Sequence, residues 1–338
     1  MTKTNVAAAA VLGLTTSALL PVLLKPLLRR WRAMDVPVER SSHARPVLRG
    51  GGVAPAAGLL AASTALFVST PPGCPSRLPV VVVGAASAAC AALGLTEDLL
   101  GVPLRARAAA QVAIGAATST CLVVAASGPW WLIPLGTLAT AGYVNVSNFL
   151  DGINGISSLH GLVVGVSLAA AGTRAGLPWL TGSGWSLAAA FIAFLPWNIA
   201  GSGLFLGDAG SYLLGGTIAA TSVAAVAAGV PFVVVLGPLV PYLTDSGVTL
   251  SRRMLQGERW YEAHRSHVYQ VLASRHGHLP VATFVAAASA LTAFSGALAG
   301  RGGRRSVVGV ALMVLAPPAY MAVPRLDAAL ATRKELRA

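Results

Sequence analysis

The sequence predicts an all-α fold: a polytopic transmembrane helical bundle that forms one integral membrane domain over residues 1–338. Hydrophobic residues make up 55% of the chain and charged residues only 10%, whereas a soluble domain has about 25% charged residues. A disordered chain would lack this apolar content. The net charge of +13 does not indicate a nucleic-acid partner, because so few polar residues cannot cover the surface of a soluble fold.

Apolar runs bounded by glycine, proline or charge give the expected spans, since a helix of about 20 largely apolar residues crosses a bilayer. Eleven such runs occur, at 6–28, 52–70, 78–95, 108–126, 129–146, 160–173, 185–197, 211–228, 231–248, 280–299 and 306–323. The first is expected to be a retained span rather than a signal peptide, because no small-residue cleavage site closes it and a strongly basic segment follows.

The basic residues are distributed unevenly between the two sides of the predicted bundle. Eighteen of the 24 lysines and arginines fall in the loops after the first, third and ninth spans and in the C-terminal tail, and six fall on the opposite side. Because positively charged loops stay in the cytoplasm, the N-terminus is expected outside and the C-terminus in the cytoplasm. The arginines of residues 301–305 are the cluster that opposes this orientation.

All eleven acidic residues fall in the predicted cytoplasmic loops or at cytoplasmic helix ends. A transporter or proton pump is expected to place some ionisable groups near the membrane midplane. The sequence predicts none there, so we expect any chemistry at the inner face.

The loop after the first span reads D-V-P-V-E-R-S-S-H-A-R-P-V-L-R-G-G-G at 35–52. Arg45, Arg49 and the flexible glycines suit an anion-binding strand for phosphates. The alternative interpretation is a basic segment that touches anionic lipid.

The loop after the third span reads G-L-T-E-D-L-L-G at 94–101, and Arg107 and Gln111 follow it. Two adjacent acids, Glu97 and Asp98, need partners where a helix leaves the bilayer. They suit a Mg²⁺ ion, which prefers oxygen ligands, or a base that activates a phosphate. A solvated helix end is the alternative.

A third polar segment, N-V-S-N-F-L-D-G-I-N-G, occupies residues 145–155. Asn145, Asn148 and Asp151 recur at a spacing of three, which places them on one face of a helix end. Three hydrogen-bonding residues in phase favour a binding role over a simple loop.

A fourth segment, W-N-I-A-G-S-G-L-F-L-G-D-A-G-S at 197–211, places Asp208 between glycines just before the eighth span. Gly210 and Ser211 could offer backbone and hydroxyl groups to phosphate at that helix N-terminus. A turn with an N-cap aspartate is the alternative.

Residues 252–270 carry His264 and His267 among arginines. The H-x-x-H spacing is part of a zinc pattern, but cysteines or other third ligands are missing nearby. We therefore expect cationic side chains that bind phosphate oxygens.

Taken together, these segments resemble the polyprenyl-phosphate N-acetylhexosamine-1-phosphate transferases, the MraY/WecA-like enzymes of glycosyltransferase family 4. The resemblance covers about residues 20 to 325, with the motifs in the family's order. Glu97 and Asp98 stand at the family's Asp-Asp pair, and Arg107 stands at a family lysine. The family's N-x-x-N-x-x-D-G-x-D-G motif is matched up to Asp151, but its last aspartate is Asn154 here.

The later motifs also match, with departures. Asn198 and the G-D-x-G-S motif around Asp208 are present, as is an Arg-Arg pair that ends at Arg253. The histidine motif, often H-x-H-H, is H-V-Y-Q at 267–270. Tyr269 and Gln270 argue against the muramyl-pentapeptide branch. The string A-H-R-S-H-V-Y-Q is similar to the branch that initiates O-antigen or related surface glycans.

The resemblance implies transfer of a HexNAc-1-phosphate from a UDP-sugar to undecaprenyl (polyprenyl) phosphate at the bacterial cytoplasmic membrane, with release of UMP. Such phosphoryl transfer depends on positioning and charge neutralisation. It also implies a Mg²⁺ cofactor, with Mn²⁺ as an alternative, bound by Asp208 and Asp98. The expected catalytic residues are Asp98, Asp208, Glu97 and His267. The expected substrate-binding residues are Asn145, Asn148, Asp151, Asn198, Arg49, Arg107, Arg253 and His264.

Two other classes of protein remain as alternatives. A transporter or flippase of lipid-linked sugars would have similar spans and a basic inner face, but the polar motifs lie on one side only. A degenerate, non-catalytic family member is favoured by Glu97, Asn154, Tyr269 and Gln270. The sequence leaves open the identity of the sugar, the place of the polyprenyl groove and the formation of a homo-oligomer.

Overall fold

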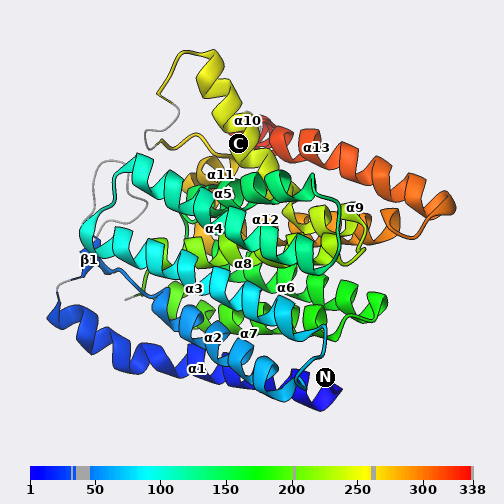
Figure 1. Cartoon of the computed structure of the whole chain (residues 1–338). Helices are drawn as coiled ribbons and strands as arrows, with labels where there is room; N and C mark the ends of the chain where they lie inside the picture. Colours follow the sequence, from blue (N-terminus) through cyan, green and yellow to red (C-terminus); the bar gives the residue numbers. More distant parts are fainter. Residues whose placement is uncertain (32, 36–45, 201–202, 260–263, 336–338) are drawn as a thin grey trace.

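The computed structural model describes the chain except for residues 32, 36–45, 201–202, 260–263 and 336–338. Several charged residues of the predicted cytoplasmic loops therefore lie outside the described residues: Arg32, Glu39, Arg40, Arg45, Glu262 and Arg337. The structure is an all-α bundle, as the sequence predicts, and its long helices lie side by side (Figure 1). The N-terminus lies at one end of the bundle and strand β1 at the other (Figure 1).

The helices are α1 (Lys3–Arg30), α2 (Val53–Ser69), α3 (Arg77–Leu100), α4 (Leu104–Ala125), α5 (Leu132–Leu150), α6 (Ile156–Ala175), α7 (Pro178–Ile199), α8 (Gly207–Ala227), α9 (Phe232–Leu236), α10 (Val240–Leu255), α11 (Val268–His276), α12 (His278–Ala299) and α13 (Gly303–Glu335). A short 3₁₀ helix, η1 (Gly237–Leu239), joins α9 to α10. Strands β1 (Met34–Asp35) and β2 (Val47–Leu48) form an antiparallel pair between α1 and α2.

Each of the eleven expected apolar segments lies on one of these helices, or on the α9–α10 unit. Among the described residues, nine helices are long and apolar enough to cross a membrane. α2, with 17 residues, is apolar but too short to be one of the nine. The chain is therefore a multi-pass membrane protein, while the number of spans and the orientation of the termini stay predictions.

The segment expected as one span at 231–248 is interrupted. α9 ends at Leu236 and α10 begins at Val240, with the 3₁₀ turn between them. Pro238 has no backbone N–H and cannot continue the ladder of a regular helix. Beyond this break Asp245 lies inside the candidate span Phe232–Leu255, with its side chain fully buried. The expectation that every acid lies in a loop or at a helix end is therefore wrong for Asp245.

α8 runs through the centre of the bundle. In its most apolar stretch 89% of the residues are buried, compared with 11% in α13 at the periphery. α3 and α5 pack along α8 over much of their length. Small residues at these contacts allow close approach of the helices, as is usual where lipid supplies no hydrophobic drive between them. Asp208, in the first turn of α8, consequently lies where α3 and α5 end.

Candidate active site

The N-terminus of α8 is capped by a side chain from another helix. Asp98, in the last turn of α3, accepts hydrogen bonds from the backbone N–H groups of Asp208 (3.0 Å) and Ala209 (2.9 Å). The first N–H groups of a helix lack partners within the helix and attract negative charge. Asp98 therefore satisfies the N–H groups of Asp208 and Ala209, while the phosphate contact expected of Gly210 and Ser211 stays a prediction.

Glycine permits this arrangement. A Cβ atom added to Gly94 would lie 2.1 Å from the carbonyl oxygen of Asp208, a distance that no side chain tolerates. α3 therefore passes directly against the first turn of α8 one helical turn before Asp98. Substitution of Gly94 would separate the two helices and weaken the cap.

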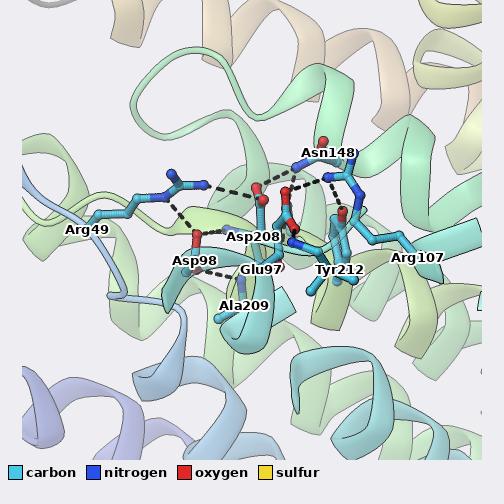
Figure 2. Close-up of polar contacts among 10 residues, drawn as sticks. Arg49, Glu97, Asp98, Arg107, Asn148, Asp208, Ala209 and Tyr212 are labelled. Carbon is cyan, nitrogen blue, oxygen red and sulfur yellow. Dashed lines mark hydrogen bonds and ion pairs between the residues drawn. The ribbon is translucent and has the colours of Figure 1, made fainter. Parts of the chain in front are cut away.

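Arg49 reaches this point from the loop before α2. Its Nε atom lies 2.7 Å from Asp98 Oδ1, and a terminal nitrogen lies 3.3 Å from Asp208 Oδ2 (Figure 2). Burial favours the neutral form of Arg49, but the carboxylates of Asp98 and Asp208 outweigh this effect and raise its pKa above the ordinary value. Arg49 thus stays cationic between two carboxylates.

The glycines after Arg49 pack the loop against the start of α8. The backbone N–H of Gly51 donates to Phe205 O and that of Gly52 donates to Leu206 O. A Cβ atom on Gly52 would lie 2.2 Å from the backbone nitrogen of Gly210. Gly51 and Gly52 are therefore buried packing residues rather than flexible ones, while the phosphate-binding role expected of Arg49 stays a prediction.

Asn148 completes the surroundings of Asp208. Its Nδ2 atom donates to Asp208 Oδ1 (2.8 Å) and lies 3.1 Å from Ser211 Oγ. Figure 2 shows the Asp208 carboxylate between Arg49 on one side and Asn148 on the other. Two segments that are distant from α8 in the sequence thus converge on the Asp208 carboxylate, which is 16% exposed.

Asp151 ends α5 and lies on the same side of the site. Burial raises its pKa to about 8, while the hydroxyl of Ser157, which donates to Asp151 Oδ1 (2.6 Å), acts against this shift. The Asp151 carboxyl group is therefore largely protonated at neutral pH in the ligand-free protein, and it can donate a hydrogen bond to a bound anion.

Asn198 holds two loops together. Its Oδ1 atom accepts a hydrogen bond from the backbone N–H of Gly155, and its Nδ2 atom donates to Leu204 O (3.2 Å). These bonds tie the loop after α5 to the loop before α8. The contacts indicate that Asn198 shapes the pocket, in addition to the supporting role at a metal that the family resemblance implies.

These residues surround a pocket of about 840 Å³. Its wall includes six of the expected site residues: Arg49, Asn148, Asp151, Asn198, Asp208 and His264. Part of α11 and the first residue of α12 form the opposite wall, through Gln270, Ser274 and His278. The α11 residues of this wall, Gln270 and Ser274, are uncharged, while the lining elsewhere also includes the charged Asp35 and Arg265.

The two histidines of the H-x-x-H segment differ in position. His264 lines the pocket, and burial lowers its pKa to about 4, with His267 acting in the same direction. His264 is consequently neutral near pH 7 rather than the expected cation. His267 is only 2% exposed and does not line the pocket, because its Nδ1 atom lies 3.0 Å from Asp245.

Glu97 and Arg107 form a separate pair beside the pocket. Arg107 lies 2.7 Å from Glu97 Oε1 and donates to the hydroxyl of Tyr212 (3.3 Å), as Figure 2 shows. Glu97 also accepts from the backbone N–H of Val102. Neither residue of this pair is among the described residues that line the pocket. Adjacent in sequence, Glu97 and Asp98 therefore serve different contacts.

Two further expected residues point elsewhere. Asn145 donates to Gln111 Oε1 (2.7 Å) and so joins α5 to α4. Arg253 pairs with Glu258 (2.7 Å) and donates to Arg259 O within its own loop. The structure brings neither of them to the pocket as far as its described residues show.

The pocket offers carboxylate and amide oxygen atoms, which are the ligands that a magnesium ion prefers. Within the part of the chain that the structure describes, no group of three or more His, Cys, Asp or Glu side chains is arranged to hold a metal. Mg²⁺ commonly takes only one or two carboxylates and completes its shell with water and substrate phosphates. Asp208, Asp151 and the amide of Asn148 offer such hard oxygen atoms to one pocket. Asp208 lines the pocket and Asp98 does not, so Asp208 fits the ion better.

Comparison with known proteins identifies a family that part of this chain matches. Residues 80–226, which run from α3 to α8, match the model of glycosyl transferase family 4. The chain carries a domain of this family. The resemblance predicted from the ordered motifs is confirmed. Asp98, Asn148, Asp151 and Asp208 all lie inside the family 4 domain, whereas Arg49 and His264 lie outside it.

Several named relatives are similar over most of their length. The chain is 27% identical over 329 residues to a Mycobacterium leprae protein named decaprenyl-phosphate N-acetylglucosaminephosphotransferase, covering 81% of this chain and 79% of that one. It is 30% identical over 212 residues to the undecaprenyl-phosphate alpha-N-acetylglucosaminyl 1-phosphate transferase of Thermotoga maritima, covering 61% and 62%. A phospho-N-acetylmuramoyl-pentapeptide-transferase of Synechococcus sp. is 30% identical over 235 residues, covering 62% and 66%.

Sequence reasoning missed three residues around the family 4 domain. Phe205 lines the pocket beside the loop that precedes α8. Asp245 and Tyr320 lie behind the opposite wall and bond to each other (3.1 Å). A signal for Asp245 was present, since an ionisable residue inside an apolar segment usually has a specific role. Nothing in the sequence pairs it with a tyrosine 75 residues later.

Proposed function

We propose that this chain transfers a HexNAc-1-phosphate from a UDP-sugar to a polyprenyl phosphate and releases UMP. The observation that carries the proposal is the Asp208 carboxylate between Arg49 and Asn148, in a pocket at the end of an apolar bundle. One substrate is a lipid and the other is soluble, so their phosphates can meet only at a membrane surface. Relatives named as polyprenyl-phosphate N-acetylglucosamine phosphotransferases support the reaction class.

The reaction exchanges one phosphorus–oxygen bond for another. An oxygen of the polyprenyl phosphate attacks the sugar-linked phosphorus of the UDP-sugar, and the bond from that phosphorus to the bridging oxygen breaks. UMP leaves with the bridging oxygen, and the product is a polyprenyl diphosphate sugar. Positioning and charge neutralisation are the main contributions a protein can make to such a transfer.

Each pocket residue has a role in that exchange. Arg49 would neutralise phosphate oxygens, and Asn148 would hold the Asp208 carboxylate in place. Asp151, largely protonated at pH 7, would donate a hydrogen bond to the pyrophosphate. Asp98 would act through Asp208, because its oxygens hold the first turn of α8.

Magnesium is part of the proposal. Asp208 would be its leading protein ligand, with the amide oxygen of Asn148 able to supply a further oxygen atom. The ion would neutralise the charge that develops on the pyrophosphate oxygens. Excess EDTA is expected to abolish activity, and full activity in EDTA would contradict this part of the proposal.

Localisation and pathway follow as further proposals. The basic loops favour a bacterial cytoplasmic membrane protein whose pocket faces the cytoplasm. The A-H-R-S-H-V-Y-Q string favours a role at the start of O-antigen or related surface glycan synthesis. The names of the relatives make UDP-GlcNAc the first sugar to test.

A panel of UDP-sugars tests the function directly. Purified protein would receive undecaprenyl phosphate, Mg²⁺ and one of UDP-GlcNAc, UDP-GalNAc, UDP-FucNAc or UDP-QuiNAc, and UMP release would be measured. We expect one of these sugars to support release that depends on the lipid phosphate. Failure of every sugar with a folded protein would favour the non-catalytic alternative.

A matched pair of variants locates the activity. Asp208→Asn removes a carboxylate from the pocket, while Glu258→Gln removes one from the loop after α10. Only the first should stop UMP release. Equal loss in both variants would contradict the proposed site.

A further inference from the structure

Asp245 is a fully buried carboxylate outside the family 4 match. Its Oδ1 atom accepts a hydrogen bond from the backbone N–H of Val268 (3.0 Å), and Oδ2 accepts one from that of Tyr269 (3.3 Å). These are the first two residues of α11. Asp245 thus caps α11 from a different helix, α10, and satisfies N–H groups that would otherwise lack partners.

Three side chains complete the shell of Asp245, and one of them is Thr249, whose hydroxyl donates to Oδ1 (3.4 Å). His267 Nδ1 lies 3.0 Å from Oδ1, and this nitrogen carries the hydrogen because the carboxylate is the acceptor. The hydroxyl of Tyr320, from α13, donates to Oδ2 (3.1 Å). A carboxylate so deeply buried is costly unless such donors surround it, so its removal should disturb every segment that it joins.

The capped helix forms the uncharged wall of the pocket. Gln270 and Ser274 of α11 line the pocket opposite Asp208. The hydroxyl of Tyr269 donates to Phe149 O (2.9 Å), next to Asn148. α11 is therefore connected at its first turn to the segment that holds the Asp208 carboxylate.

The last turn of α11 has a weaker connection. Asp327 of α13 pairs with Arg275 (3.1 Å) and with His276 (2.9 Å), but these basic side chains are almost half exposed. Exposed ion pairs contribute little to stability. The position of α11 therefore depends on its buried contacts, which are the Asp245 cap and the apolar packing of Val268, Tyr269 and Leu272.

We propose that Asp245 is a positioning residue, which holds α11 at the distance from Asp208 that the bound sugar nucleotide requires. The proposal rests on the function proposed above, because it assigns the α11 wall to the soluble substrate. Asp245 itself does not line the pocket and acts through α11 and His267. The lipid phosphate does not depend on this wall in the proposal, so the two substrates should respond differently to its displacement.

Hydrogen exchange tests the positioning without any assay of activity. In Asp245→Asn the amide nitrogen cannot accept, so the donors on one of the two oxygens, either Val268 and His267 or Tyr269 and Tyr320, lose their partner and the cap of α11 weakens. We expect the backbone amides of Val268 and Tyr269 to exchange about tenfold faster or more. The amides of Asp208 and Ala209, capped by Asp98, should keep their rates. Unchanged exchange in α11 would overturn the proposal.

Kinetics test the consequence for substrates. Tyr320→Phe removes one donor to Asp245, and Tyr143→Phe is its matched control, because Tyr143 bonds to His160 in the bundle interior (2.7 Å). We expect Asp245→Asn to raise the KM for the UDP-sugar about tenfold and Tyr320→Phe to raise it about threefold, since small displacements of a binding wall are costly. The KM for polyprenyl phosphate should stay unchanged, as should both constants in Tyr143→Phe.

The outcomes separate the two proposals. Equal rises in both KM values would indicate general disruption and overturn the positioning role. If Asp245→Asn does not fold, the same two KM values can be compared in Tyr320→Phe. If the wild-type protein releases no UMP from any UDP-sugar, the proposed function fails, whereas the exchange experiment still decides whether Asp245 holds α11.

Discussion

Two buried carboxylates each cap a helix that lines the pocket, and their surroundings differ in charge. Asp98 caps α8 and contacts the cationic Arg49 beside the partly exposed Asp208. Asp245 caps α11 and accepts only from backbone N–H groups, His267 and hydroxyl groups. Capping by a buried carboxylate thus positions two helices, and each helix contributes to a different wall of the pocket. The α8 wall (Asp208 and Arg49) carries charges that phosphoryl transfer needs, whereas the α11 wall (Gln270 and Ser274) is uncharged.

This contrast separates the steps that each wall should control. Charges near the reacting phosphates affect the transition state, so changes in the α8 wall should lower kcat. Uncharged groups that contact the substrate before and during the reaction should mainly affect KM. The following predictions test this division, starting with the largest expected effect.

Asp208→Asn should lower kcat about a thousandfold, the loss expected when a central electrostatic group is removed. The variant keeps the size of the side chain, so the helix bundle should remain folded. UMP release measures the activity, and size-exclusion chromatography in detergent measures the fold. Normal turnover would show that the α8 wall is not the site of reaction.

Asp98→Asn should lower kcat about a hundredfold, because loss of the α8 cap and of the Arg49 pair displaces Asp208. The free energy of unfolding should fall by about 1–3 kcal/mol as a buried donor loses its partner. Steady-state kinetics and thermal unfolding measure the two effects. If the KM for the sugar nucleotide rose while kcat held, the α8 wall would behave like the α11 wall and the division would fail.

Glu97→Gln should lower kcat by less than about tenfold, because this residue pairs with Arg107 and lies beside the pocket. The comparison with Asp98→Asn uses two neighbouring residues whose side chains serve different contacts. The same UMP assay measures both. Equal losses would indicate that Glu97 takes part in the reaction despite its position.

His264→Gln should leave the pH dependence of kcat between pH 6 and 8 unchanged. Burial lowers the pKa of His264 from 6.5 to about 4, so the ring has no proton to lose in that range. The lowered pKa also means that His264 reduces stability as the pH falls from 6.5 to about 4, since the unfolded chain binds the proton more tightly. In the His264→Gln variant, the free energy of unfolding should therefore change less between pH 6.5 and about pH 4. If the wild-type kcat changed with pH near 6.5 and the variant lost this change, the assignment of a neutral His264 would be contradicted.

Much of the fold could be predicted because the signals for it are local. Each apolar run lies on a helix, since the lipid requires every backbone group to be satisfied within the segment. Local signals failed where one residue changed the path of the chain, as at Pro238. They also placed Asp245 at the end of a span that continues to Leu255.

The candidate site was predicted less completely. Asn148, Asp151 and Asp208 were expected near one another and do line one pocket. Asn145, at the same spacing as Asn148, instead bonds to Gln111. Periodicity shows that residues share a helix face, but which helix covers each part of that face depends on packing between segments distant in the sequence.

The sequence by itself determined the membrane class, the places of the helices and the resemblance to glycosyl transferase family 4, because composition and ordered motifs suffice for these. Only the tertiary structure decided which hydrogen-bond donors surround each buried acid. Asp98 finds its donors 110 and 111 residues away, and Asp245 finds its own 23 and 24 residues away. A buried carboxylate is stable only where donors converge on it, and that convergence exists only after the helices have packed.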